Sequence, residues 1–281
     1  MADGITWFNQ FFDEMTALAV TYTKAGFIVA ADGRSQHSSE DPTKRNDEQQ
    51  KIFQGRIGTA DIAWTLAGTV FNDDKSFSLV DEVMKAMQAA NASKPQPLGC
   101  APWLDIFAAN LRESVAEARN AGLIPPFTAN ANCPADSAER LTFATVFMAG
   151  YFCNGRPSSV RIRLQHHKGE LVDPSPRTLC AASFDPKEHT TYHGSVKIVL
   201  RYNNLHEDKR FLKYFHPLGR SLNEGLAHVK GSIEACCDPL ALEVDPVFCK
   251  NIGGHIHAAA VTPSGFQWLI EPKDFYPKSG I

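Results

Sequence analysis

The stretch that decides the fold is residues 16–34, which reads TALAVTYTKAGFIVAADGR. Its first part, residues 16–23, is apolar and β-branched enough to predict a strand. Lys24-Ala25-Gly26 fits a three-residue hairpin loop in which Gly26 supplies a positive φ angle. Residues 27–31 are apolar at every position, which is typical of a strand buried on both faces. The stretch therefore predicts a hairpin whose second strand lies inside a sheet.

Downstream of this hairpin, strands and helices are predicted in blocks. The further strands share short apolar or alternating runs and comprise 51–54, 62–68, 141–152, 160–165, 180–184, 196–200 and a terminal hairpin within 253–270. The helices share a capping signal and begin at Ser78, at Pro102 and at the capping box of Ser221 with Glu224. Residues 35–49 and 123–140 read as loops. This order excludes a doubly wound parallel fold and predicts helices layered on antiparallel sheets.

Composition narrows the class of protein. The chain has 281 residues, of which 43% are hydrophobic and 21% charged, and its net charge is −3. These values exclude a disordered chain, a collagen-like fibre and a disulfide miniprotein. The sequence has no basic block, which argues against a dedicated nucleic-acid binder. It also has no apolar run near the roughly 20 residues needed to span a bilayer.

The first fifteen residues and the cysteines point to a compartment. Residues 1–15 carry acidic charges and interrupted apolar residues, which does not fit a secretory signal and predicts a cytoplasmic protein. Within them, residues 4–13 have the spacing of a short amphipathic helix. The seven cysteines form no C-x-x-C pair. They are expected to be small buried side chains in a reducing compartment, with a catalytic thiol or a metal site as the alternatives.

Several short motifs share their spacing with one known family. Asp32 follows Thr16 by 16 residues, and Lys51-Ile52-Phe53 forms a lysine-bearing strand. Leu66-Ala67-Gly68 precedes the first helix, and Gly253-Gly254 precedes the terminal hairpin. In this pattern the chain resembles mature proteasome β subunits and their bacterial relative HslV. The resemblance runs from Thr16 to about residue 270 and is most specific over the first 53 residues.

This resemblance implies a fold and an assembly. The implied fold is α+β, the four-layer αββα sandwich of N-terminal nucleophile (Ntn) hydrolases, in which two antiparallel sheets lie between helices. Residues 16–281 would form this domain, and residues 1–15 an N-terminal extension or pro-segment. A homo-oligomeric ring acting on a peptide or protein substrate is expected. No cofactor, metal, nucleic acid or membrane partner is expected, and an ATPase partner stays undefined.

The resemblance also implies a role for each matched residue. Thr16 would be the nucleophile, with its own α-amine, of pKa about 8, as the base. Lys51 would lower the pKa of that amine, and Asp32 would keep Lys51 charged and in place. The backbone N–H of Gly68 would stabilise the oxyanion. The alternatives are a β-branched strand residue for Thr16, a structural ion pair for Asp32 and Lys51, and a close-packing glycine for Gly68.

The sequence departs from the family pattern in three respects. Lys51 follows Thr16 by 35 residues, a few more than in the family, and Gly33 replaces the serine of an Asp-Ser-Arg triplet. The accessory acid and serine that the family carries near its Gly-Gly pair are missing. The nearest candidates for these accessory roles are Asp245 and Ser195.

The internal position of Thr16 decides its chemistry. While Met15 precedes it, the Thr16 nitrogen is an amide and cannot serve as a base. Activation would need cleavage of the Met15–Thr16 bond, or initiation at Met15 followed by removal of the methionine. The alternative function is a non-catalytic proteasome-like scaffold or binding subunit whose nucleophile is permanently blocked.

Two histidines raise the question of a metal. His255 and His257 alternate on the predicted terminal strand and so face the same side, as a metal-binding pair would. The sequence suggests no third ligand for them, so packing or a surface position is expected.

Overall fold

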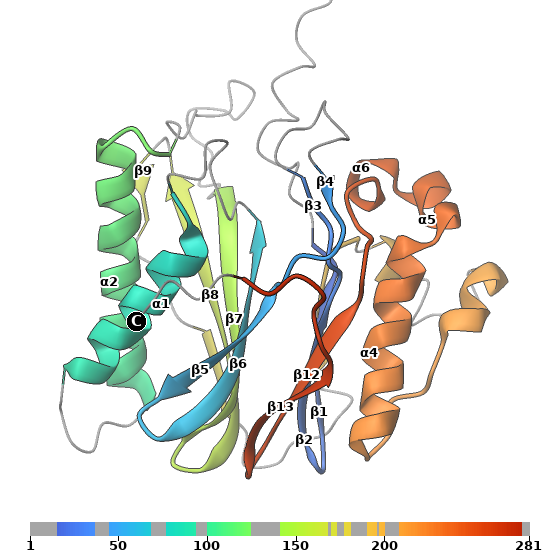
Figure 1. Ribbon diagram of the computed structural model, residues 1–281, viewed down its shortest axis with the longest axis horizontal. Helices are drawn as coiled ribbons and strands as arrows, with labels where there is room; N and C mark the ends of the chain where they lie inside the picture. The colour runs from blue at the N-terminus through green and yellow to red at the C-terminus, as the bar shows by residue number, and fades with distance from the viewer. Residues whose placement is uncertain are drawn as a thin grey trace, which may run out of the picture.

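In the computed structural model, two antiparallel β-sheets lie face to face between two layers of helices (Figure 1). The structure describes residues 16–36, 45–68, 77–93, 100–124, 141–167, 170–172, 177–180, 190–195, 197–199 and 208–276. The predicted fold class, an α+β sandwich with the layer order αββα, is confirmed. It arises because each sheet has two apolar faces, one covered by the other sheet and one by helices.

The first sheet has the strand order β11-β1-β2-β12-β13. Its strands are β1 (Leu18–Thr23), β2 (Gly26–Ala31), β11 (Thr191–His193), β12 (His257–Thr262) and β13 (Gly265–Ile270). The predicted hairpin is present, but Thr23 pairs with Gly26, so its turn has two residues rather than three. Gly26 has a φ of 149°, and a Cβ there would lie 2.4 Å from the Val261 carbonyl oxygen. Only glycine fits this contact with β12.

The second sheet has the strand order β10-β8-β7-β6-β5, with β9 paired to β8. Its strands are β5 (Ile52–Ile57), β6 (Ala60–Gly68), β7 (Leu141–Cys153), β8 (Arg156–His167), β9 (Glu170–Leu171) and β10 (Arg177–Cys180). Two short strands, β3 (Ser35–Gln36) and β4 (Arg45–Asn46), pair with each other. The prediction of a wholly irregular loop over 35–49 was therefore wrong.

Helices cover the outer face of each sheet (Figure 1). The helical elements are α1 (Leu79–Ala92), α2 (Cys100–Asn120), the 3₁₀ helix η3 (Lys209–Tyr214), α4 (Leu222–Cys237), α5 (Pro239–Val244) and α6 (Pro246–Cys249). Ser78 caps α1 by accepting the Asp81 N–H, as predicted. The predicted capping box of Ser221 with Glu224 opens α4. These caps satisfy backbone N–H groups that a helix start leaves unpaired.

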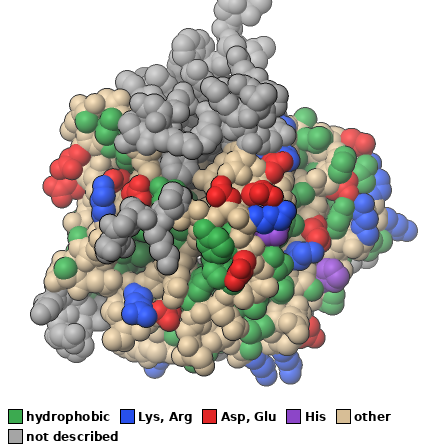
Figure 2. All heavy atoms as spheres, in the orientation of Figure 1, with side chains coloured by type: hydrophobic (Ala, Val, Ile, Leu, Met, Phe, Trp, Pro, Cys, Tyr) green, Lys and Arg blue, Asp and Glu red, His purple; other side chains and the backbone are tan. Residues whose placement is uncertain are grey.

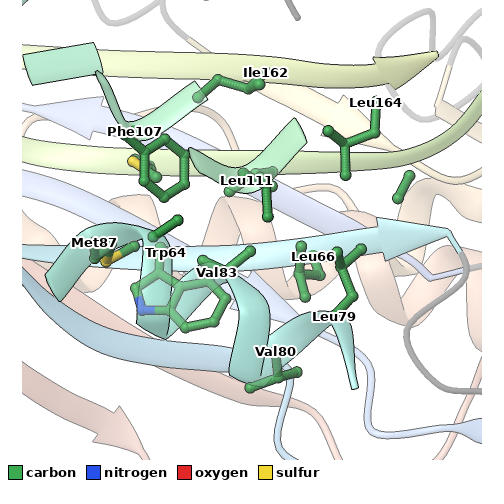
Figure 3. Packing of buried hydrophobic residues seen from close by; sticks show 14 of the residues in the cluster. Trp64, Leu66, Leu79, Val80, Val83, Met87, Phe107, Leu111, Ile162 and Leu164 are labelled. Atoms are coloured by element: carbon green, nitrogen blue, oxygen red, sulfur yellow. The ribbon is translucent and has the colours of Figure 1, made fainter. Parts of the chain in front are cut away.

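Three apolar layers hold the sandwich together. The largest lies between α1, α2 and the second sheet, where Trp64, Phe107 and Leu111 interlock (Figure 3). A second layer lies between the two sheets and includes Leu18 and Phe27. The third lies between the first sheet and α4. Because β1 and β2 contribute residues to the second and third layers, both strands are buried on both faces, which the sequence predicted for β2.

Some local predictions fail or lie outside the described residues. Residues 197–199 are helical rather than part of a strand, and the Val199 N–H donates to the Ser195 carbonyl. Cys153 is disulfide-bonded, so the expectation that every cysteine is reduced was wrong there. The helix predicted over 4–13, most of the loop over 123–140 and the strand over 181–184 lie outside the described residues.

The surface gives little indication of a partner. On the face shown in Figure 2, the described Lys and Arg side chains are interspersed with Asp and Glu rather than gathered in one block. None of the helices in the described part of the chain has the length and apolar character that crossing a membrane requires.

Candidate functional site

Three of the predicted site residues meet where β1 and β5 begin and β2 ends. Thr16 precedes β1, Asp32 follows β2, and Lys51 precedes β5. The Lys51 Nζ donates to Thr16 Oγ1 at 3.1 Å and to Asp32 Oδ1 at 3.0 Å. The antiparallel β1–β2 ladder explains why the first two are neighbours, because it pairs Leu18 with Ala31 and so aligns the start of β1 with the end of β2.

Asp32 is the centre of this arrangement. Its fully buried carboxylate accepts the Ala17 N–H at 2.9 Å and the Gly253 N–H at 3.0 Å, in addition to Lys51. Burial raises the pKa of the Asp32 carboxyl, while the Lys51 charge and the N–H donors act in the opposite direction. All of these partners are donors, so the arrangement suits the ionised carboxylate. Asp32 thereby ties the start of β1 to the Gly253 loop and to Lys51.

Lys51 is fixed at its backbone as well as at its ammonium group. Its N–H donates to Nε2 of the buried His257 at 2.9 Å. The preceding residue, Gln50, donates its N–H to the Asp274 carbonyl, and its Oε1 accepts the Tyr276 N–H. The segment that leads into β5 is thus held by the chain that follows β13. These hydrogen bonds fix the Lys51 backbone and so restrict where its long side chain can reach.

Ser195 and Asp245 form a second buried polar pair. Ser195 Oγ donates to Asp245 Oδ2 at 2.7 Å, and both residues are buried. Gly194, the residue before Ser195, lies against the Thr16 backbone, since a Cβ there would be 3.5 Å from the Thr16 carbonyl oxygen. The sequence offered only weak signals for these two residues, a Gly-Ser dipeptide and the nearest acid before Gly253. Their contact with each other appears only in the fold.

Gly68 belongs to the second sheet, on the strand that pairs with β5. It is the last residue of β6, pairs with Ala144 and has a φ of 103°. The β5–β6 register pairs Ile52 with Thr65, which brings the end of β6 alongside the Lys51 segment. Among the described residues, no hydrogen bond joins Gly68 to Thr16, Asp32 or Lys51. An oxyanion role for Gly68 is therefore an expectation based on position.

The departure at Gly33 has a steric cause. A Cβ at this position would lie 2.6 Å from the His255 carbonyl oxygen and 2.9 Å from the Asp47 carbonyl oxygen. The neighbouring Arg34 holds Asp47 by an ion pair of 2.6 Å and donates to the Ile252 carbonyl at 2.9 Å. The longer segment before Lys51 is thus packed against the Gly33 backbone, which leaves no room for a serine side chain.

The other candidate side chains do not converge on a shared ligand. His257 accepts from the Lys51 N–H, whereas His255 Nε2 is 2.8 Å from the Glu271 carbonyl oxygen, so the two rings have different partners. Within the described residues, no group of three or more His, Cys, Asp or Glu is suited to a metal ion. Burial raises the pKa of the free thiol of Cys249 to about 11, which keeps it protonated and a poor nucleophile at neutral pH.

Comparison with known proteins finds only distant similarities. No protein-family model matches this sequence, and no curated protein matches it. A solved structure of the helical assembly of the Anbu complex from Pseudomonas aeruginosa has a TM-score of 0.49 and 12% identity, covering 92% of this chain and 88% of that chain. The Anbu (Gly-1) mutant from Hyphomicrobium sp. strain MC1 has a TM-score of 0.49 and 12% identity over 91% and 88%. Anbu (ancestral beta-subunit) from Yersinia bercovieri has a TM-score of 0.46 and 13% identity over 91% and 87%.

These findings correct the family named from the sequence motifs. The similar solved structures are Anbu proteins, and no family model matches, so the assignment to the proteasome β-subunit and HslV family was wrong. The identities are low, and the site is assigned from the contacts of this chain alone.

Proposed function

We propose that this protein hydrolyses amide bonds, with Thr16 as the nucleophile once its α-amine is free. The observation that carries this proposal is the position of the Lys51 Nζ, within 3.1 Å of Thr16 Oγ1 and 3.0 Å of Asp32 Oδ1. A structural ion pair between Asp32 and Lys51 would not require the ammonium group to contact a threonine hydroxyl as well. Peptides or proteins are the substrates that this chemistry would suit.

The proposed reaction proceeds through an ester on Thr16. The free amine takes the hydroxyl proton while Oγ1 attacks the substrate carbonyl, and the N–H of Gly68 is suited to stabilise the oxyanion. The protonated amine then returns its proton to the leaving amine as the carbon–nitrogen bond breaks. Water, activated by the same amine, hydrolyses the ester and frees Thr16.

The charges around Thr16 support an amine base. The Lys51 ammonium disfavours a second positive charge nearby, so it lowers the pKa of a free Thr16 amine toward neutrality. Asp32 offsets part of this effect and holds the Lys51 ammonium in place through an ion pair of 3.0 Å. Ser195, paired with Asp245, directly follows Gly194, which lies against the Thr16 backbone, so its hydroxyl is our candidate for passing a proton between the amine and the substrate.

Whether residues 1–15 are removed decides between a hydrolase and a non-catalytic subunit. Cleavage at Met15–Thr16, or initiation at Met15 followed by removal of the methionine, would give the amine, whereas an intact bond leaves a non-catalytic scaffold or binding subunit. Residues 16–281 are proposed as the hydrolase domain, and residues 1–15 as an extension that is removed or that blocks it.

Two measurements on protein from its native host test the proposal. Intact mass is expected to show a chain that begins at Thr16, and this chain should cleave fluorogenic peptides. Thr16→Ala should abolish cleavage, while Thr16→Ser, which keeps a hydroxyl, should retain part of it. A mass that includes residues 1–15 together with no cleavage would favour the blocked scaffold. Cleavage that survives in Thr16→Ala would reject the assigned nucleophile.

Assembly and location are further parts of the proposal. We infer a homo-oligomer, which analytical ultracentrifugation of the purified chain tests; the helical assembly named above belongs to the Pseudomonas protein. A cytoplasmic location is supported by the free thiols of Cys236, Cys237 and Cys249 and opposed by the disulfide of Cys153. Fractionation of the native host tests whether the protein is found in the cytoplasm.

A further inference from the structure

We propose that His257 is a positioning residue, which sets the reach of Lys51 by accepting its backbone N–H. This inference rests on the proposed function, because its consequence is the distance between the Lys51 ammonium and Thr16. It adds a residue from β12 that has no role in the reaction itself and does not touch substrate.

His257 joins the two sheets at the site. It opens β12 in the first sheet, where it pairs with Ala31, the residue before Asp32. Lys51 precedes β5 in the second sheet, and its N–H is outside the β5–β6 ladder. The 2.9 Å hydrogen bond from this N–H to His257 Nε2 therefore links the strand beside Asp32 to the backbone of Lys51. This bond fixes the distance between the Lys51 backbone and the Thr16 and Asp32 oxygens that the Lys51 side chain contacts.

The chemistry of the ring suits this role. Because the Lys51 N–H is a donor, Nε2 must be unprotonated, so a neutral His257 carries its proton on Nδ1. That Nδ1 is buried and makes no hydrogen bond of standard geometry among the described residues, although the His255 backbone favours its protonated form. The next four residues of β12, 258–261, are all buried and apolar. Burying a polar ring in an otherwise apolar strand is costly unless the ring makes a useful hydrogen bond. The bond that His257 Nε2 accepts from the Lys51 N–H accounts for its presence here.

The charge state of His257 keeps the acceptor available. Burial and the nearby Lys51 charge lower the pKa of His257 to about 3, and the backbone of His255 opposes this only in part. The titratable side chains that influence His257 are Lys51 and His255, and Trp268 of β13 faces it with ring centroids 6.4 Å apart. His257 therefore remains neutral throughout the range in which a threonine amine works. Protonation would replace the acceptor by a donor and release Lys51.

The test compares His257→Gln with His257→Leu in the full chain. Gln carries its amide oxygen near the place of Nε2 and keeps an acceptor, whereas Leu fills the space without one. We expect His257→Gln to stay within about threefold of the original kcat/KM and His257→Leu to lose about tenfold to a hundredfold. The acid limb of the pH profile should move to higher pH in His257→Leu, because a retreating Lys51 no longer lowers the pKa of the Thr16 amine. A purely structural residue would lower activity and Tm together without moving that limb.

A crystal structure of each variant gives a readout that needs no turnover. We expect the Lys51 Nζ to lie beyond hydrogen-bonding distance of the Thr16 hydroxyl in His257→Leu and within it in His257→Gln. An unmoved Nζ in His257→Leu, or an unchanged acid limb, would overturn the role of His257. A wild-type chain without Thr16-dependent hydrolysis would instead refute the proposed function, and the two crystal structures would still decide whether His257 positions Lys51.

Discussion

At the scale of single residues, the site depends on the contacts that Asp32 makes. Its carboxylate joins the Ala17 and Gly253 N–H groups to the Lys51 ammonium in a place without solvent. A buried charge is tolerable only when such partners surround it. The same carboxylate is therefore expected to matter both to folding and to the placement of Lys51.

Asp32→Asn should destabilise the protein by about 3–5 kcal/mol, because the amide turns a donor toward N–H groups and leaves Lys51 uncompensated. Urea denaturation measures this change. Asp61→Asn is the matched control, since Asp61 pairs with the largely exposed Arg56 and should cost less than about 1 kcal/mol. Equal stability of Asp32→Asn and the original protein would contradict the central role of the carboxylate.

Ser195→Ala should lower kcat about 10²-fold with little change in KM, if the Ser195 hydroxyl passes a proton at Thr16. Steady-state kinetics on a fluorogenic peptide measure the effect. Ser264→Ala, in the exposed turn between β12 and β13, is the control and should leave both constants unchanged. An unchanged kcat in Ser195→Ala would limit the Ser195–Asp245 pair to a structural role.

At the scale of elements, the packing of α4 on the first sheet depends on a helical glycine. A Cβ on Gly225 would lie 2.6 Å from both Ile28 Cδ1 and Thr23 Cγ2, so α4 approaches β1 and β2 through this residue. Ala is the better helix former by about 1 kcal/mol, which by itself would favour Gly225→Ala. Local propensity and tertiary packing thus make opposite predictions for one substitution.

We expect packing to prevail, so that Gly225→Ala destabilises the protein by about 1–3 kcal/mol. Asn223→Ala, at an exposed position of the same helix, should change stability by no more than about 0.5 kcal/mol. Thermal unfolding of the two variants tests the comparison. A stabilised Gly225→Ala would show that α4 can move away from the sheet at little cost.

At the scale of the whole molecule, buried histidines make stability depend on pH. Burial lowers the pKa of His193 to about 4 and that of His257 to about 3, and it also lowers the pKa of His228. Below about pH 6.5 the unfolded chain binds protons that the folded chain does not. The free energy of unfolding should therefore fall as the pH decreases from 6.5 toward 4.

Within that window, the fully buried His257 should contribute a slope of about 1.4 kcal/mol per pH unit. Urea denaturation at pH 7, 6 and 5 should therefore show a shallower decline for His257→Gln than for the original chain. Ser264→Ala, in the exposed turn between β12 and β13, is a control expected to keep the original slope. Parallel declines for His257→Gln and the original would contradict the lowered pKa of His257.

Some elements could be predicted from the sequence and others could not. The hairpin over residues 18–31, the cap at Ser78 and the capping box at Ser221 were predictable, because each is specified by near neighbours. Residues 197–199 were misread as a strand, since short apolar runs do not distinguish a strand from a helical turn. The family was also misassigned, because short motifs spaced along a chain do not separate distant relatives.

The sequence by itself determined that helices are layered on antiparallel sheets, since strand and helix periodicity are local properties. The αββα layer order and the choice of Thr16, Asp32 and Lys51 came from the resemblance in motif spacing. The tertiary structure alone decided which of these residues touch, that Ser195 meets Asp245, and that His257 holds the Lys51 backbone. The physical reason is distance along the chain. Lys51 and His257 are separated by 206 residues, and only the packing of one sheet on the other brings such groups within hydrogen-bonding range.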